Sequence, residues 1–316
     1  MAQVAPGRSI LVRVPASSAN LGPGFDSIGL ALGLWDEYAV TTTGEPGLEI
    51  EVTGEGAADV PTDETHLVNA TMRHTWQQLG VDPPTGLRLK ARNGVPHGRG
   101  LGSSATAIVA GVVAAQALSV REWPQAGADL EIDREVAGHL SSVLEGHPDN
   151  ASASVHGGLT VSWMPDATGL DQGARTVTAR PLLHPDIDVV VFVPEAQLAT
   201  KQARAVLPTA VPLAEAAANA GRAALLVHAL TAEPAHLHAG TRDWLHQEPR
   251  RASYPASMAL VDTLRAAGHA AVISGAGPTV LVLTSRSRAE EVVAPDAQWA
   301  RLTPGIPVSG ARVTVL

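Results

Sequence analysis

The sequence predicts an α+β protein built from two lobes. The chain has 316 residues, which is long for a single hydrophobic core. Segments with strand periodicity and segments with helix periodicity are mixed without the strict alternation of a doubly wound parallel sheet. A turn-rich stretch near residue 170 is followed by a new series of strands and helices. We therefore expect domains at residues 1–170 and 171–316.

Local patterns predict the individual elements. Alternating apolar residues before Pro15 favour a strand. We expect Pro15 to end this strand and a polar loop to follow it. Residues 38–44 and 48–54 also alternate and end at glycine, which favours antiparallel strands joined by turns. Apolar residues at helical spacing predict helices over residues 65–79, 105–118, 133–144, 214–230 and 257–268. Further strands are expected over residues 86–93, 159–163, 186–194 and 270–283, the last interrupted by a glycine-rich turn.

Composition excludes several classes of protein. The net charge is −9 and no run of basic residues occurs, so we expect neither nucleic acid nor a membrane as a partner. The longest apolar stretch is shorter than a membrane span. The first residues do not read as a secretory signal, and the chain has no cysteine. The expected location is therefore the cytoplasm.

The stretch PHGRGLGSSATA, which begins at Pro96, combines glycines and serines directly before an apolar helix. Glycines can turn successive backbone N–H groups toward one point, and the helix N-terminus adds its positive dipole end. This glycine loop (residues 96–102) thus suits a phosphate or another anion. A tight turn with a serine N-cap is the simpler alternative. The spacing fits neither a Walker loop nor a dinucleotide-binding fingerprint.

Proline, three residues, and then Gly-Leu-Gly-Ser-Ser-Ala resembles the ATP phosphate loop of the GHMP kinases, the galacto-, homoserine, mevalonate and phosphomevalonate kinases. PASSANLGPGFDSIG near the N-terminus and ISGAGPT near the C-terminus resemble two further motifs of that superfamily. The resemblance implies a first lobe like ribosomal protein S5 domain 2 and a ferredoxin-like second lobe. It also implies that ATP is bound by Pro96, His97, Gly98, Arg99, Gly100, Leu101, Gly102, Ser103, Ser104, Ala105 and Thr106.

The N-terminal motif and EGHPDN at residues 145–150 resemble the homoserine kinases in particular. That resemblance implies ATP-dependent phosphorylation of the side-chain hydroxyl of L-homoserine to O-phospho-L-homoserine, a step of threonine biosynthesis. Asn20 and Asp26 would hold the acceptor hydroxyl as catalytic residues. A carboxylate is a weak base toward an alcohol, so Asp26 is expected to orient the hydroxyl, and whether it also takes the proton stays open.

The same resemblance implies contacts to the rest of the substrate. Asp149 would meet the ammonium group, and Arg204 and Arg250 would bind the carboxylate. The other expected substrate-binding residues are His147, Asn150, Gly275 and Gly277. Each assignment has a simpler structural alternative, because Asx residues beside glycine hold turns, an Asp before a helix caps it, and arginine is usually solvated. Lys201 is expected on the surface.

The magnesium ligands are expected to be Ser104 and Glu145. Homoserine kinases tend to carry a magnesium-binding glutamate eight residues before the pocket histidine, but here that position is His139. Imidazole is a poor magnesium ligand. Three interpretations remain open: Ser104, phosphates and water hold the metal alone; Glu135 or Glu145 substitutes; or catalysis is weakened.

Two other functions compete with a homoserine kinase. One is a GHMP-type kinase for another small alcohol, and the other is a sensor that binds nucleotide and amino acid without turnover. The motif EGHPDN and the two arginines argue against mevalonate-type substrates, which have no ammonium group. Because related kinases are often dimeric, the resemblance also implies a homodimer.

Overall fold

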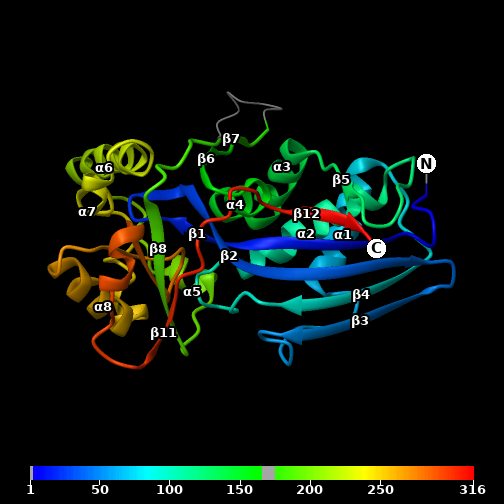
Figure 1. The fold of residues 1–316 in the computed structure, drawn as a ribbon, viewed down its shortest axis with the longest axis horizontal. Coiled ribbons are helices and arrows are strands. Elements are labelled where there is room, and N and C mark those ends of the chain that lie inside the picture. Colours follow the sequence, from blue (N-terminus) through cyan, green and yellow to red (C-terminus); the bar gives the residue numbers. More distant parts are fainter. Residues whose placement is uncertain (1–2, 166–174) are drawn as a thin grey trace.

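The computed structural model describes residues 3–165 and 175–316, which form two lobes with one sheet each (Figure 1). This confirms the expected two-lobed α+β organisation. The first sheet has the order β3-β4-β2-β1-β12-β5, and β6 pairs with β2 and with β7. Its strands are β1 (Ser9–Asn20), β2 (Gly24–Thr43), β3 (Gly47–Gly54), β4 (Gly86–Asn93), β5 (Asp129–Leu130), β6 (Leu159–Trp163), β7 (Val177–Ala179) and β12 (Arg312–Val315).

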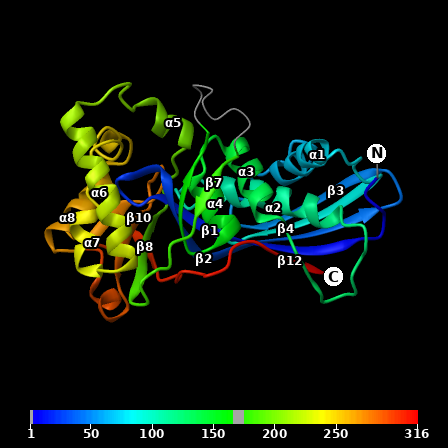
Figure 2. The same cartoon turned by 90° about the horizontal axis from the view of Figure 1, so that it is seen from above.

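Four helices cover one face of the first sheet (Figure 2). They are α1 (Leu67–Leu79), α2 (Ser103–Leu118), α3 (Arg134–Glu145) and α4 (Asp149–His156). Helix α2 is apolar on nearly all sides because it is buried between its neighbours. The indole N–H of Trp76 on α1 donates to the Ala115 carbonyl of α2 at 3.1 Å. This contact holds α1 against the C-terminal half of α2.

The second sheet has the order β11-β8-β10-β9 and is antiparallel throughout. Its strands are β8 (Ile187–Pro194), β9 (Ala270–Ile273), β10 (Val280–Ser285) and β11 (Trp299–Leu302). Both faces are covered, which explains the continuous apolar run of β8. Val190 and Phe192 pack with residues of α8 (Pro255–Ala266), whereas Val189 and Val191 face α6 (Leu213–Thr231).

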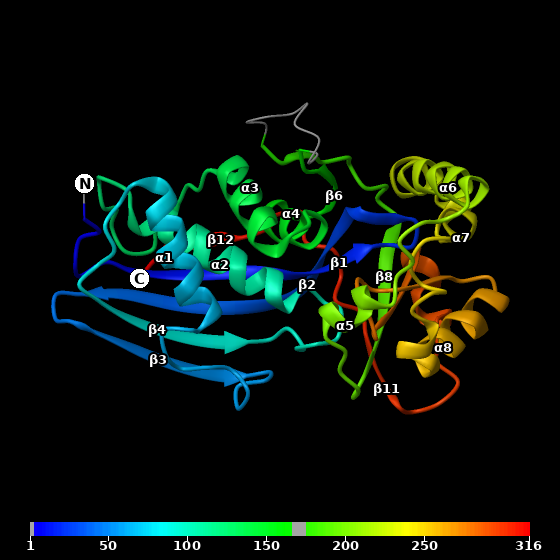
Figure 3. The same cartoon turned by 180° about the vertical axis from the view of Figure 1, so that it is seen from behind.

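The two lobes share apolar packing. Leu21 and Leu30 of the first lobe belong to the same buried cluster as residues of β8 and of α7 (Leu237–Gly240). Helix α5 (Thr200–Ala205) lies at the junction of the lobes (Figures 1 and 3). Short 3₁₀ helices occur at Pro234–His236, Arg251–Ser253 and Arg286–Glu291. Within residues 3–165 and 175–316, no helix combines the length and the apolar character that a membrane span requires.

The expected helices are confirmed to within a few residues at most ends, and Gly80 ends α1 in the left-handed conformation. One expectation was wrong: β1 continues through Pro15 to Asn20 instead of giving way to a loop. The pairing of β1 with β2 shifts register between Pro15 and Ala16, which lets the strand pass the proline. Ser17 and Ser18 are polar but fully buried, so the alternation that reveals a strand is lost there.

The pairing of β3 also differs from expectation. It runs parallel to β4 and is separated from β2 by that strand, because helix α1 forms the crossover between β3 and β4. The boundary expected at residue 170 lies outside the described residues. Two strands that follow this boundary belong to the first sheet: β7 pairs with β6, and β12 pairs with β1. The chain therefore returns to the first lobe at its end (Figure 1).

Candidate active site

A cavity of about 390 Å³ between the lobes gathers most of the predicted site residues. Asp26 is joined to the wall through its ion pair with Arg204. Segments from both halves of the chain therefore converge on one space. The predicted residues in its wall are Asn20, Pro96, His97, Gly98, Arg99, Gly100, Leu101, Gly102, Ser103, Ser104, Glu145, His147, Asp149, Asn150, Arg204, Arg250 and Gly275.

The glycine loop has the backbone that its sequence predicts. Gly98, Gly100 and Gly102 have φ values of 64°, 74° and 74°, in the left-handed region that favours glycine. Gly102 is the N-cap of α2, and no side chain caps this helix. The first intrahelical bond runs from the N–H of Thr106 to the Gly102 carbonyl, at 2.8 Å. The preceding N–H groups of the helix are therefore available to an anion in the cavity.

The turn between β9 and β10 holds the glycine loop from the second lobe. The Ser274 hydroxyl lies 2.6 Å from the Gly100 carbonyl and 2.8 Å from the Ser18 hydroxyl. The N–H of Thr279 donates to the Arg99 carbonyl at 3.3 Å. The ISGAGPT motif therefore supports the conformation of the loop.

Two predicted ATP-binding residues do not reach the cavity. Ala105 and Thr106 lie on the buried face of α2, where both are fully inaccessible. The Thr106 hydroxyl points into the core and donates to the Asp36 carboxylate at 2.5 Å. Helical periodicity is the reason, because Ala105 and Thr106 lie on the side of α2 that faces the core, whereas Ser103, Ser104 and Ala107 line the cavity.

Asp36 is a buried carboxylate that the motifs did not reveal. It accepts hydrogen bonds from the backbone N–H groups of Gly94 and Val95, at 2.8 and 3.0 Å, and from the Tyr38 and Thr106 hydroxyls. Burial raises the pKa of Asp36, although these hydrogen bonds oppose the shift. Asp36 thus links the segment before the glycine loop to the helix that follows the loop.

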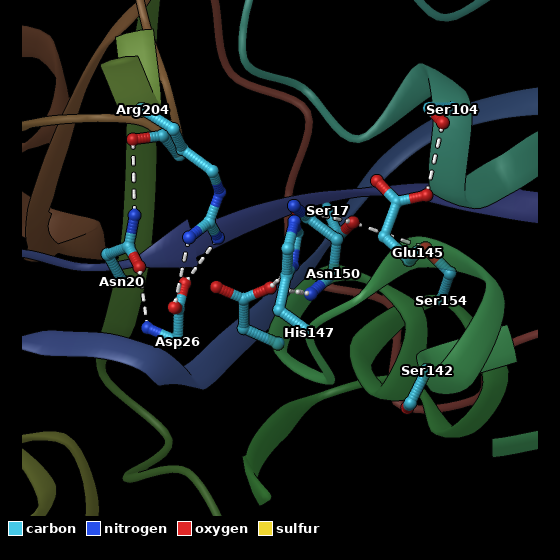
Figure 4. A network of polar contacts seen from close by, with 12 residues as sticks. Ser17, Asn20, Asp26, Ser104, Ser142, Glu145, His147, Asn150, Ser154 and Arg204 are labelled. Atoms are coloured by element: carbon cyan, nitrogen blue, oxygen red, sulfur yellow. Dashed lines mark hydrogen bonds and ion pairs between the residues drawn. The ribbon is translucent and has the colours of Figure 1, made fainter. Parts of the chain in front are cut away.

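The N-terminal motif forms the tight turn between β1 and β2 that carries Asn20 and Asp26 (Figure 4). Asn20 and Asp26 have φ values of 70° and 54°, which Asn and Asp adopt more readily than other side chains. The Asn20 amide accepts from the N–H of Asp26 at 3.0 Å and donates to the Gly275 carbonyl at 3.1 Å. Both oxygens of Asp26 accept from Arg204, at 2.6 and 3.1 Å.

The corner between α3 and α4 supplies the acidic end of the cavity. Asp149 is 1 % exposed, and its carboxylate lies 2.7 Å from Nδ1 of His147. Burial disfavours the charged form of His147, but the hydrogen bond and charge of Asp149 outweigh it and raise the pKa. The Asn150 side chain accepts from the Ser17 hydroxyl at 3.1 Å (Figure 4).

Arg250 lines the cavity and is 1 % exposed, which excludes the solvated alternative for this residue. Its Nε donates to the Ala203 carbonyl at 2.8 Å. Gly277 differs from expectation, because it lies outside the cavity wall and a Cβ there would meet the ring of Tyr254 at 2.9 Å. Gly277 therefore shapes the turn and does not line the cavity. Lys201 is exposed, as expected.

Ser104 and Glu145 lie side by side at the N-terminus of α2, with 3.0 Å between the hydroxyl and one carboxylate oxygen (Figure 4). Burial raises the pKa of Glu145, while His147 and the Ser104 hydroxyl oppose the shift. His139 does not line the cavity, because its Nδ1 accepts from the N–H of Thr176 at 3.2 Å. Glu135 is exposed in the first turn of α3.

The side chains of Asp26, His147 and Asp149 form a second group of potential ligands, whose ligand atoms lie within 4.8 Å of one another. Its carboxylates already have cationic partners, Arg204 for Asp26 and His147 for Asp149. The oxygen pair of Ser104 and Glu145 suits a hard cation such as Mg²⁺ better than this mixed set. Of the two groups, only the pair beside the glycine loop therefore fits magnesium.

Two family descriptions match the chain: GHMP kinases N terminal domain at residues 66–158, and GHMP kinases C terminal at residues 214–295. The chain therefore belongs to the GHMP kinases, the class that its fold and its glycine loop define. Within this class it is a member of the homoserine kinase family. It is 46 % identical over 309 residues to the homoserine kinase of Streptomyces avermitilis, covering 98 % of this chain and 96 % of that protein.

Other relatives agree. The homoserine kinase of Rhodococcus erythropolis is 50 % identical over 280 residues, which are 88 % of this chain and 87 % of that protein. The crystal structure of homoserine kinase from Cytophaga hutchinsonii has a TM-score of 0.81 at 22 % identity and covers 98 % of both chains. Mevalonate diphosphate decarboxylase from Staphylococcus aureus has the same fold, with a TM-score of 0.62 at 18 % identity over 97 % of this chain and 98 % of its own. The resemblance to homoserine kinases and the expected GHMP kinase fold are thus confirmed.

Proposed function

We propose that this chain transfers the γ-phosphoryl group of ATP to the side-chain hydroxyl of L-homoserine and so makes O-phospho-L-homoserine. The observation that carries the proposal is that one cavity holds both an anion site and an acidic site. The uncapped N-terminus of α2 and the buried Asp149 line the same cavity, and the ligand atoms of Asp26, His147 and Asp149 lie within 4.8 Å of one another. An anion site and a zwitterion site in one space suit a kinase whose acceptor is an amino acid.

The substrate end matches the three functional groups of homoserine. The buried Asp149 carboxylate would pair with the ammonium group, and the guanidinium of Arg250 would bind the carboxylate. The hydroxyl would then face Asp26 and Asn20, whose positions are fixed by the turn between β1 and β2. Arg204, the other arginine expected at the carboxylate, forms an ion pair with Asp26 and lines the same cavity.

The nucleotide end begins at the glycine loop. The free N–H groups at the start of α2 would bind the phosphates. The cavity wall also includes the apolar residues Val60, Pro61, Leu67 and Val68, and we assign the nucleoside to these residues.

In the reaction, a bond forms between the homoserine hydroxyl oxygen and the γ-phosphorus while the bond from that phosphorus to the ADP oxygen breaks. The hydroxyl proton passes to Asp26 or to an oxygen of the phosphoryl group. The residues of this chain contribute alignment and charge stabilisation rather than covalent chemistry. Mg²⁺, when bound by Ser104 and Glu145, would neutralise the phosphate charge.

A change at Glu145 tests the metal assignment. We expect Glu145→Gln to raise the Mg²⁺ concentration for half-maximal activity by about tenfold, because a neutral amide is a weaker ligand for a hard cation than a carboxylate. The measurement is a magnesium titration at saturating ATP and homoserine. Glu135→Gln is the matched control, since this glutamate is exposed and outside the cavity. An unchanged requirement in Glu145→Gln would assign the metal to Ser104, phosphates and water.

ADP production with homoserine, serine, threonine and mevalonate tests the proposed function. Turnover that depends on homoserine, with a phosphomonoester product, supports it. Turnover with mevalonate would favour a kinase for another alcohol, and binding of nucleotide and amino acid without turnover would favour a sensor. The role in threonine biosynthesis follows from membership of the homoserine kinase family, whereas the cytoplasmic location and the homodimer stay predictions.

A further inference from the structure

Two aromatic rings pack together at the cavity: Phe25 lines it, and His246 is fully buried. Phe25 belongs to the turn that carries Asp26, and His246 stands four residues before Arg250 in the sequence. The rings are stacked with 5.2 Å between their centroids and 27° between their planes. The guanidinium groups of Arg204 and Arg250 lie over the ring of Phe25, at 5.5 and 5.6 Å from its centroid.

The hydrogen bonds of His246 fix its tautomer. Its Nε2 lies 2.8 Å from the carbonyl oxygen of Gly22, which can only accept. Its Nδ1 lies 3.3 Å from Nη1 of Arg250, which can only donate. The proton therefore resides on Nε2, and the lone pair of Nδ1 receives the Arg250 N–H.

The surroundings keep this ring neutral. His246 is fully buried, and burial lowers its pKa, as does the charge of Arg250, whereas Asp243 and Asp26 oppose the shift. The Asp243 carboxylate lies 3.8 Å from Nε2, but it is occupied by backbone N–H groups, including those of His246 and Gln247 at 3.0 and 2.8 Å. A protonated Nδ1 could not accept from Arg250.

The guanidinium of Arg250 is thus held at two points, by the Ala203 carbonyl on Nε and by His246 on Nη1. Arg250 lines the cavity, and its guanidinium has further N–H groups that can donate to a carboxylate. Through Nε2, the same imidazole is bound to Gly22, two residues after Asn20 and four before Asp26. One ring therefore connects the carboxylate-binding arginine to the turn that faces the acceptor hydroxyl.

We propose that His246, stacked on Phe25, is a positioning residue that sets the distance between the carboxylate subsite at Arg250 and the hydroxyl subsite at Asp26. This inference rests on the proposed function and concerns how the site selects its amino-acid substrate by length. Homoserine and serine differ by one methylene group between these two ends. A fixed Arg250 accepts the longer amino acid with its hydroxyl at Asp26 and leaves the shorter one out of reach.

Two substitutions test the two hydrogen bonds of His246 one at a time. In His246→Gln the amide nitrogen reaches the place of Nε2 and can donate to Gly22, but nothing accepts from Arg250. In His246→Asn the amide oxygen reaches the place of Nδ1 and can accept from Arg250. We expect His246→Gln to raise the KM for homoserine by about tenfold or more, with the KM for ATP within about twofold of wild type. We expect His246→Asn to restore a large part of this loss.

His156→Asn is the matched control, because His156 is 4 % exposed but lies outside the cavity wall. Both KM values should stay within about twofold of wild type in this variant. If the His246 variants fail to fold, Phe25→Leu replaces them, since it removes the stack on His246 and the aromatic face beneath both arginines. This variant is also expected to raise the homoserine KM selectively.

An unchanged homoserine KM in folded His246→Gln would overturn the inference. An equal rise in the KM values for homoserine and ATP would also overturn it. Equal effects of the Gln and Asn variants would do the same, because either result indicates that His246 has only a structural role. These outcomes are distinct from failure of the proposed function, in which the wild-type protein itself phosphorylates no homoserine.

Discussion

Gly100→Ala is expected to lower kcat/KM for ATP by about 100-fold or more. Gly100 has a φ of 74°, where a Cβ costs about 1–2 kcal/mol. The added Cβ would also overlap the carbonyl oxygen of Ser274 and lie 2.9 Å from the backbone nitrogen of Gly277. Because these neighbours are backbone atoms of the second lobe, the glycine loop and the turn that supports it must separate. Overpacking of this kind costs about 1–3 kcal/mol further.

Gly98→Ala is the matched control. Gly98 has a similar φ of 64°, but its added Cβ would meet only the flexible side chain of Gln197, at 3.3 Å. We expect kcat/KM for ATP to fall by about tenfold or less, which is the backbone cost alone. Equal losses in the two variants would mean that the contact between the lobes at Gly100 does not hold the phosphate site. Initial rates over a range of ATP concentrations give both values.

The second large effect is expected for Asp26→Asn, which should lower kcat by about 10²–10⁴-fold and leave the KM for ATP nearly unchanged. Asparagine tolerates the φ of 54° at this position, and the backbone N–H can still donate to Asn20, so the turn should persist. What is lost is the negative charge that faces the acceptor hydroxyl and pairs with Arg204.

The measurement is kcat at saturating homoserine and ATP, together with thermal unfolding as a check on the fold. A kcat within about tenfold of wild type would show that Asp26 serves mainly to hold Arg204, and that the proton leaves by another route. A loss of activity accompanied by a large fall in the unfolding temperature would instead place Asp26 among the residues that maintain the turn.

The sequence predicted those parts of the site that stand in contiguous motifs. Glycines at positive φ before an apolar helix leave a local signature, and so do Asn20 and Asp26 beside their glycines. The residues that hold these groups left no such signal. Asp36 stands inside a long strand, and its partners at Gly94 and Thr106 are distant in sequence. The hydrogen bond of His246 to Gly22 joins residues that are 224 positions apart in the sequence.

The strand pattern failed where polar residues are buried. Ser17 and Ser18 belong to β1 but face the glycine loop and the second lobe, so burial there does not follow apolar character. The parallel pairing of β3 and the return of β12 to the first sheet depend on long-range register, which local periodicity does not encode. His139 hydrogen-bonds with Thr176, whereas Glu145 lies beside Ser104, so the assignment of the metal to Ser104 and Glu145 stays a prediction.

The most direct test is a crystal structure of the protein with L-homoserine, Mg²⁺ and a non-hydrolysable ATP analogue. We expect the γ-phosphate at the N–H groups that begin α2, the homoserine hydroxyl between that phosphate and Asp26, the ammonium group on Asp149 and the carboxylate on Arg250. A triphosphate bound away from the glycine loop would contradict this arrangement. A homoserine molecule bound in the reverse direction, with its hydroxyl remote from Asp26, would contradict it as well.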